Sequence, residues 1–131
     1  MKVLPDWLHS APAAERSRFV AAPVTVKLSA GKQMLAWRET PGVMAFPVTG
    51  AERVYLVSQE GREITLYHIK PGGSCVLTAS CILGGSGFPA LAEVEKEVLA
   101  WAVLAAVFRE WVAHSEFWRR YVFQLLGERV R

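Results

Sequence analysis

The chain has 131 residues, a length that fits one domain whose buried core needs no metal or disulfide to hold it. Hydrophobic residues make up 52% of it, and its five tryptophans are spread along the chain, which excludes a disordered tail. The formal net charge is only +3 and the basic residues are interleaved with acidic ones, so the composition does not indicate a nucleic-acid-binding surface.

The N-terminal segment, residues 1–22, is predicted to be helical. Ser10 is expected to cap a helix through its hydroxyl, Pro12 fits the first turn, and the Ala-Ala-Pro at 21–23 ends the helix. Pro5 and Asp6 stand where a signal peptide needs an apolar centre, and no apolar run reaches the roughly 18 residues of a membrane span. We therefore expect a cytoplasmic protein that does not contact a membrane.

The middle of the chain, residues 24–101, has the pattern of short β-strands. Val24, Val26 and Leu28 alternate on one strand face. The other expected strands are 32–37, 43–48, 53–58, 63–69, 91–94 and 98–101, with a flexible loop at 84–90. Glycine or proline turns about every ten residues favour a sandwich or barrel. The predicted fold class is mainly β with flanking α-helices: a jelly-roll β-roll (double-stranded β-helix) of about eight short strands.

The C-terminal segment, residues 103–131, is predicted to form two packed amphipathic helices. The apolar stripe of the first comprises Leu104, Val107, Phe108, Trp111 and Val112. Ser115 is expected to cap the second helix. The stripe of that helix comprises Trp118, Tyr121, Val122, Leu125 and Leu126. Without a repeat or a low-complexity tract, residues 1–131 are predicted to be a single domain.

Three glycine-containing motifs stand at fixed places in the stretch VTGAERVYLVSQEGREITLYHIKPGGSCVLTASCILGG. Gly50 precedes a strand, Gly61-Arg62-Glu63 opens the next strand, and Pro71-Gly72 makes the turn after it. On these motifs the chain, from about Val24 to its end, resembles the cyclic nucleotide-binding-like sensor domain of bacterial Crp/Fnr transcription regulators. The resemblance implies a non-enzymatic domain that senses a small-molecule effector or another signal.

The resemblance also implies partners. Crp/Fnr regulators continue after the sensor as a dimerisation helix and a helix-turn-helix DNA reader, whereas this sequence stops at Arg131. We therefore expect no direct DNA binding by this chain, unless it is part of a longer regulator rather than a stand-alone module. A homodimer is expected through the C-terminal helix, with a candidate seam at Trp118, Tyr121, Val122 and Leu125.

The ligand-binding segment departs from the family pattern. Members that bind cyclic nucleotides carry a Gly-Glu pair and an Arg, and this chain has Val76-Leu77 and Phe88-Pro89 at those places. Loss of the Arg would remove a charge-assisted pair worth about 1.5–3 kcal/mol, so we expect poor binding of a cyclic phosphate. Alternation gives no reason to turn Arg38, Arg53 or Arg62 inward instead.

Several neutral residues therefore form the candidate ligand pocket, which would take an apolar or weakly polar effector. They are Cys75, Val76, Leu77, Thr78, Phe88, Pro89 and Ala90. The alternative is a filled β-roll that serves as a protein-interaction or dimerisation module. A solid interior at Val76, Thr78 and Phe88 would favour that alternative.

Cys75 and Cys81 leave two further hypotheses open. They are small apolar residues of the core, or they form a thiol redox sensor in which Cys75→Ser abolishes an oxidant-induced change of the loop. The histidines His9, His68 and His114 are scattered, so no zinc or iron-sulfur set is recognisable. We expect no metal, no cofactor and no catalytic residue, because Ser58 and Ser74 lack the partners of a nucleophilic serine.

Overall fold

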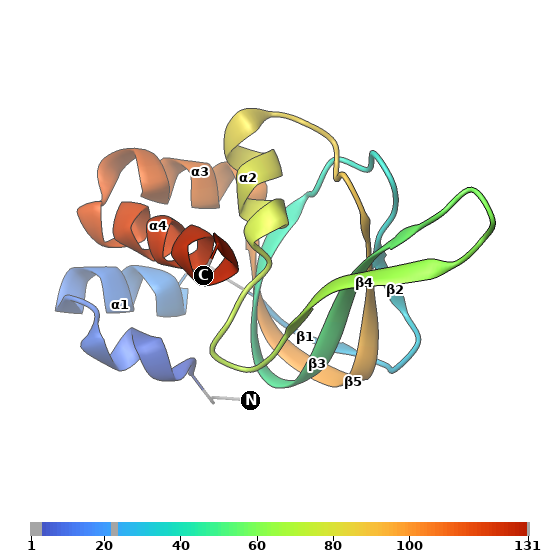
Figure 1. The fold of residues 1–131 in the computed structure, drawn as a ribbon. Helices are drawn as coiled ribbons and strands as arrows, with labels where there is room; N and C mark the ends of the chain where they lie inside the picture. Colours follow the sequence, from blue (N-terminus) through green and yellow to red (C-terminus); the bar gives the residue numbers. More distant parts are fainter. Residues whose placement is uncertain (1–3, 22–23, 131) are drawn as a thin grey trace.

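The computed structural model describes residues 4–21 and 24–130. A short 3-10 helix precedes the first α-helix, and the remaining helices and strands follow in the order drawn in Figure 1. The elements are η1 (Asp6–Ser10), α1 (Ala13–Ala21), β1 (Val24–Leu28), β2 (Gln33–Leu35), β3 (Val43–Val57), β4 (Glu63–Ile69), α2 (Val76–Gly84), β5 (Leu91–Leu104), α3 (Ala105–His114) and α4 (Glu116–Val130). None of these helices is long and apolar enough to cross a membrane.

The strands of the described residues form one antiparallel sheet that curves into a roll. Its order is β1-β5-β3-β4, and β2 pairs separately with β5. The central pair runs from Val43 opposite Leu104 to Tyr55 opposite Leu91. Figure 1 shows α3, α4 and α1 stacked beside this roll, with α2 next to α3 and α4 on the side toward the roll. The predicted class, mainly β with flanking helices, is confirmed.

Two long strands replace four of the expected short ones. The predicted strands 43–48 and 53–58 are parts of β3, and 91–94 and 98–101 are parts of β5. The expected turn at Gly50 is an irregular point inside β3, where the register against β5 shifts on both sides. Gly50 has a φ of +89°, and a Cβ there would overlap the carbonyl of Glu97 on β5. Both strands therefore bend together without ending.

The N-terminal helix α1 is confirmed, but its expected cap is wrong. The Ser10 hydroxyl donates to the Trp7 carbonyl at 2.9 Å inside η1 and does not reach α1. The first α-helical turn instead closes when the Arg16 amide donates to the Pro12 carbonyl. The predicted end of the helix at 22–23 lies outside the described residues.

The C-terminal helices α3 and α4 follow the prediction closely. Phe108 and Trp111 of α3 are buried, and the Trp118 amide donates to the Ser115 hydroxyl, which caps α4 as expected. The prediction that Leu104 begins the apolar stripe of the helix is wrong. Leu104 is the last residue of β5, and 64% of its surface is exposed.

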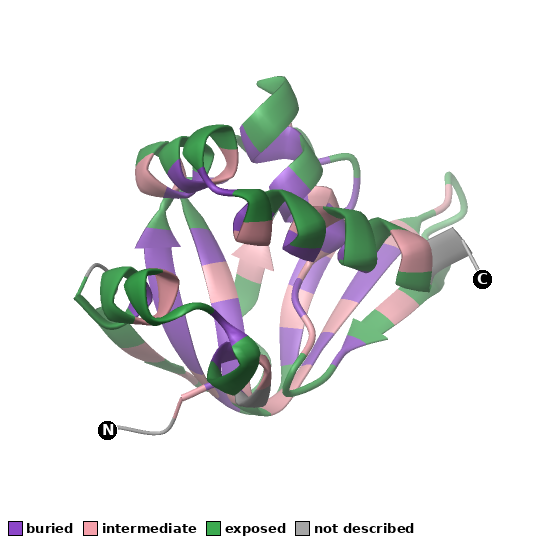
Figure 2. Ribbon diagram, turned by 90° about the vertical axis from the view of Figure 1, so that its left-hand side faces the viewer, coloured by how far each residue is buried: buried purple, intermediate pink, exposed green. Residues whose placement is uncertain are grey.

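An aromatic cluster joins these helices to the roll. It includes rings of η1, α1, β3, α3 and α4. Figure 2 shows buried stretches on the strands and helices that face one another. Its members include Trp7, Phe19, Phe46, Phe108, Trp111, Trp118 and Tyr121. Neighbouring ring centroids are 4.7 to 6.3 Å apart, so the N-terminal segment, α3, α4 and β3 share one core.

Helix α2 lies inside the segment predicted as part of the roll. It begins after Cys75 and ends at Gly85, whose φ of +74° stops the helix. Val76, Ala79 and Ile82 recur at three-residue spacing and pack into the aromatic cluster. Cys81 lies on the other side, in a second cluster beneath the roll with Val54, Ile69 and Phe88. Helix α2 therefore separates the two parts of the core.

Candidate functional site

A cavity of about 170 Å³ lies where the start of α2 meets the roll. Its walls come from β2, from the segment before β3, from β3 and β5, and from the first turn of α2. They comprise Met34, Leu35, Glu39, Gly42, Val43, Ala45, Glu52, Cys75, Thr78 and Ala92. The walls are mostly apolar, but two carboxylates lie among them and, within the described residues, no lysine, arginine or histidine does.

Glu52 is the most unusual side chain of this cavity. It lies on β3 opposite Val94 and Ile69, and only 4% of its surface is exposed. Its carboxylate oxygen Oε2 is buried without a hydrogen-bond partner. Burial raises the pKa of Glu52 from an ordinary 4.5 to about 7. The carboxyl therefore changes its charge near neutral pH, and it belongs to a residue that lines the cavity.

The predicted pocket residues separate into three groups. Cys75 and Thr78 line the cavity. Val76 packs toward the helices, and Phe88 and Ala90 are fully buried beneath the roll. Leu77 is partly buried against that same cluster, and Pro89 is exposed. The interior at Val76 and Phe88 is thus packed, but the space beside Thr78 is open.

Sequence reasoning missed Glu52 although a signal for it existed. The strand expected at 53–58 carries apolar Val54 and Leu56 at alternate positions. Extension of that alternation by one step places Glu52 on the same inward face. The expected strand began at Arg53, after a turn predicted at Thr49-Gly50, and therefore left this position out.

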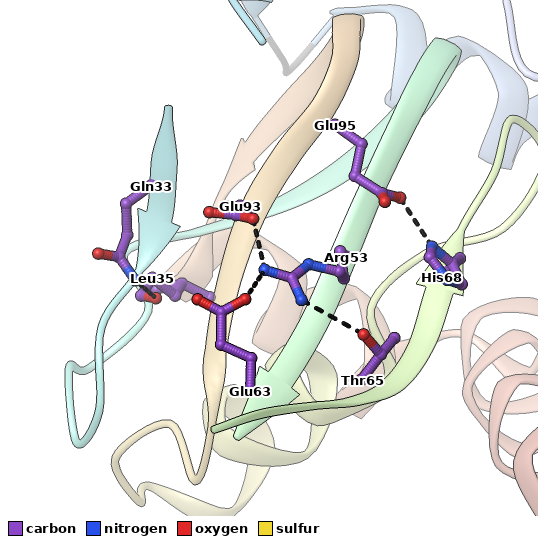
Figure 3. Close-up of polar contacts among 8 residues, drawn as sticks. All are labelled: Gln33, Leu35, Arg53, Glu63, Thr65, His68, Glu93 and Glu95. Carbon is purple, nitrogen blue, oxygen red and sulfur yellow. Dashed lines mark hydrogen bonds and ion pairs between the residues drawn. The ribbon is translucent and has the colours of Figure 1, made fainter. Parts of the chain in front are cut away.

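Arg53, the neighbour of Glu52, points to the outside of the roll (Figure 3). Its Nη2 atom lies 2.6 Å from Glu93 of β5 and 2.5 Å from Glu63 of β4. Its guanidinium also lies 4.0 Å from the centre of the Tyr55 ring. Hydrogen bonds to Glu93 and then to Glu63 raise the pKa of Arg53. Arg53 therefore forms ion pairs with Glu63 and Glu93 on the outer face of the roll, opposite the cavity.

The other arginines considered for an inward orientation are exposed. Arg38 lies 5.8 Å from the centre of the Trp37 ring, and Arg62 is in the turn before β4. A second polar pair on the outer face joins His68 Nδ1 to Glu95 at 2.7 Å (Figure 3). Among the described residues, no group of three or more His, Cys, Asp or Glu side chains is placed to hold a metal ion.

The two cysteines are free thiols; Cys75 precedes the first residue of α2 and Cys81 lies within the helix. Cys75 is hydrogen bonded to the Tyr67 hydroxyl at 3.4 Å, and Cys81 donates to the Gly87 carbonyl at the same distance. Burial raises the pKa of Cys75, and hydrogen bonds from Thr78 and Tyr67 offset only part of this effect. The thiol is therefore protonated at neutral pH and is a poor nucleophile.

A labelling experiment tests this property of Cys75. In the folded chain at pH 7.5, iodoacetamide should alkylate Cys75 more slowly than in the chain unfolded by urea, because burial raises the pKa of the thiol and so lowers the thiolate fraction. Peptide mapping by mass spectrometry separates Cys75 from Cys81. Equal rates in folded and unfolded chain would contradict the assignment and would favour the redox-sensor hypothesis.

The candidate dimer seam lies largely inside this chain. Trp118, Tyr121 and Leu125 are buried in the aromatic cluster, and Val122 is partly buried. Within residues 116–128 of α4, the exposed large apolar side chains are Phe123 at 69% and Leu126 at 43%. The homodimer itself stays a prediction, and its interface on α4 would have to use these two residues rather than the buried ones.

Comparison with solved structures identifies the fold. The chain superposes on a protein described as a Crp/Fnr-family transcriptional regulator from Eubacterium rectale with a TM-score of 0.77 and 26% identity, covering 97% of this chain and 58% of that one. The catabolite activator protein of Thermus thermophilus gives a TM-score of 0.78 at 16% identity, with 95% and 57% covered. No protein-family model and no curated protein sequence matches the chain.

The same fold occurs outside transcription regulators. The regulatory subunit of a cAMP-independent protein kinase A from Trypanosoma brucei superposes with a TM-score of 0.73 at 13% identity, over 93% of this chain and 42% of that one. The chain spans a little over half the length of the regulators it matches. These matches confirm the resemblance to the Crp/Fnr sensor domain, with its cyclic nucleotide-binding-like fold.

Proposed function

We propose that this chain is the non-enzymatic, ligand-sensing domain of a transcription regulator, and that its effector binds in the cavity between α2 and the roll. The observation that carries the proposal is the Glu52 carboxylate, buried in the wall of that cavity with Oε2 unpaired. A buried charge without a partner costs free energy of folding. A ligand that pairs with this carboxylate would offset the cost in the bound state. A filled scaffold without a ligand has no such compensation.

Helix α2 connects the cavity to the C-terminal helices. Cys75 and Thr78 contact the cavity from its first turn, while Val76, Ala79 and Ile82 pack against α3 and α4. Arg109 of α3 also donates from Nε to the Ile82 carbonyl at 3.3 Å. A ligand that favours one position of α2 would therefore bias the position of α3 and α4.

A cyclic nucleotide is not the proposed effector. The cavity wall carries Glu39 and Glu52 and no basic side chain within the described residues, so a phosphodiester would meet like charge without a counter-ion. Arg53 does not relieve this, because Glu63 and Glu93 already hold it on the outer face.

The wider context of the domain is proposed on the resemblance to regulators of almost twice this length. In such a setting the domain acts in the bacterial cytoplasm, forms a homodimer through α4, and affects DNA binding only through a further domain. Exposed Phe123 and Leu126 on α4 support the dimer.

The second candidate function is an interaction module with a filled roll, which the packed interior at Phe88 favours.

A ligand screen separates these two functions. Small molecules of varied charge are tested for their effect on the thermal unfolding of the 131-residue chain, and native mass spectrometry of purified protein looks for a retained molecule. A ligand at 100 times its Kd should stabilise the fold by about 2.7 kcal/mol. The variant Ala92→Leu, which fills the cavity wall, should lose this effect, while Ala106→Leu on the exposed side of α3 should keep it. A screen without any stabilising molecule would favour the interaction module.

A further inference from the structure

We propose that the cavity takes a small organic cation, a protonated amine or amidine on an apolar body, with Glu52 as its counter-ion. This inference rests on the proposed sensor function and names the class of its effector. It is carried by three properties of the cavity, namely its charge, its size and the unpaired carboxylate in its wall.

The charge of the cavity favours a cation. Glu52 and Glu39 supply two carboxyl groups, and the neutral polar groups are the Cys75 thiol and the Thr78 hydroxyl. One Glu39 oxygen accepts from the Ala36 amide at 2.9 Å, so Glu39 is already partly satisfied. Glu52 Oε2 has no partner in the described structure. An N–H⁺ donor placed beside Glu52 would supply both the missing hydrogen bond and the missing positive charge.

The size and the walls of the cavity limit the rest of the ligand. An apolar cavity of about 150 Å³ holds a benzene molecule, and this cavity measures about 170 Å³. Alkyl groups of Met34, Leu35, Val43, Ala45 and Ala92 form the remaining wall. The ligand therefore carries its charged nitrogen on a body about as large as one aromatic ring. A cyclic nucleotide is several times larger than benzene and carries the opposite charge.

Such a ligand makes binding depend on pH. Glu52 titrates with a pKa of about 7 in the free protein, and only its ionised form pairs with a cation. The titratable groups that face this region from neighbouring elements are Glu39 before β3, the Cys75 thiol before α2 and the Tyr67 hydroxyl of β4, which is bonded to Cys75. The raised pKa of Cys75 keeps that thiol neutral. Affinity should therefore increase as pH rises through 7.

Benzamidine is a suitable probe, because its amidinium offers N–H donors from two NH2 groups on a single ring and stays protonated through pH 8. Calorimetric titration of the 131-residue chain compares it with benzamide, its neutral counterpart, and with benzoate, its anionic one. Benzamidine should bind at least tenfold more tightly than either at pH 8. Its affinity should fall about 100-fold between pH 8 and pH 5, as Glu52 becomes protonated.

Variants test the role of Glu52 directly. Glu52→Gln should remove both the preference for benzamidine over benzamide and the pH dependence, while Glu60→Gln in an exposed turn should change neither. The pH series on the unaltered chain tests the inference without any variant. Tighter binding of benzoate or benzamide would overturn the cation while leaving the sensor function in place. Failure of all three probes would also overturn it, and the wider ligand screen would then decide on the function.

Discussion

The variant Glu52→Gln is expected to raise the free energy of unfolding of the ligand-free chain by about 3 kcal/mol at pH 8. In the folded protein burial raises the pKa of Glu52 to about 7, and in the unfolded chain it has its ordinary value of 4.5. At pH 8 the folded state must hold a buried anion, whereas the unfolded state exposes it to water. Glutamine keeps the shape of the side chain and removes that charge.

The sign of this effect with pH follows from the direction of the shift. Between pH 4.5 and 7 the folded state retains a proton that the unfolded state has lost, so stability falls as pH rises and then stays constant above 7. Below pH 4.5 both states are protonated, and the variant should differ little from the unaltered chain. Urea unfolding followed by tryptophan fluorescence from pH 4 to pH 8 measures the difference. A difference that does not change with pH, or the same change in Glu60→Gln, would contradict the assignment.

The fold was largely predictable, because most of it depends on local periodicity. Apolar spacing of three and four residues identified α3 and α4, and the Ser115 cap was identified from its residue type. Strand limits were less predictable. Glycine usually ends a strand, but Gly50 bends β3 where it passes close to Glu97 of β5. That contact joins residues far apart in the sequence, and alternation within one strand carries no information about it.

Only the part of the candidate site that lies in one continuous segment of the sequence was predictable. Cys75 and Thr78 were found because they lie in the segment that resembles a ligand-binding one. Met34 and Ala92 reach the cavity through the pairing of β2 with β5, which the sequence does not specify. Glu52 carried a signal in its alternation with Val54. However, a glutamate is usually exposed, so its burial depends on the cavity that the fold creates.

The adjacent charged residues Glu52 and Arg53 have different roles in this roll. Arg53 and its partners Glu63 and Glu93 form a closed set on the outer face (Figure 3), and such a set stabilises strand pairing without any ligand. Glu52 on the inner face has no equivalent partner for Oε2. Adjacent residues of β3 thus differ in role. Arg53 is paired with carboxylates of this chain, whereas Glu52 has a carboxylate oxygen that a bound ligand could pair with.

The variant Trp118→Ala is expected to cost about 4 kcal/mol of folding free energy, as is typical of a fully buried large aromatic side chain. Trp118 has no exposed surface, and its ring lies 4.9 Å from Trp111 of α3, 5.5 Å from Trp7 of η1 and 5.8 Å from Phe46 of β3. Its removal would leave a cavity where the C-terminal helices, the N-terminal segment and the roll meet. A cavity there would also weaken the packing through which α2 is coupled to α4.

A matched substitution separates this effect from the loss of any tryptophan. Trp37 is 55% exposed, so Trp37→Ala should cost less than about 1 kcal/mol. Trp118→Phe should lie between the two, because it keeps a ring in the cluster and removes an indole Nε1 that is buried without a partner. Urea unfolding followed by far-ultraviolet circular dichroism measures all three without relying on tryptophan emission. Similar losses in Trp118→Ala and Trp37→Ala would contradict a core shared by the helices and the roll.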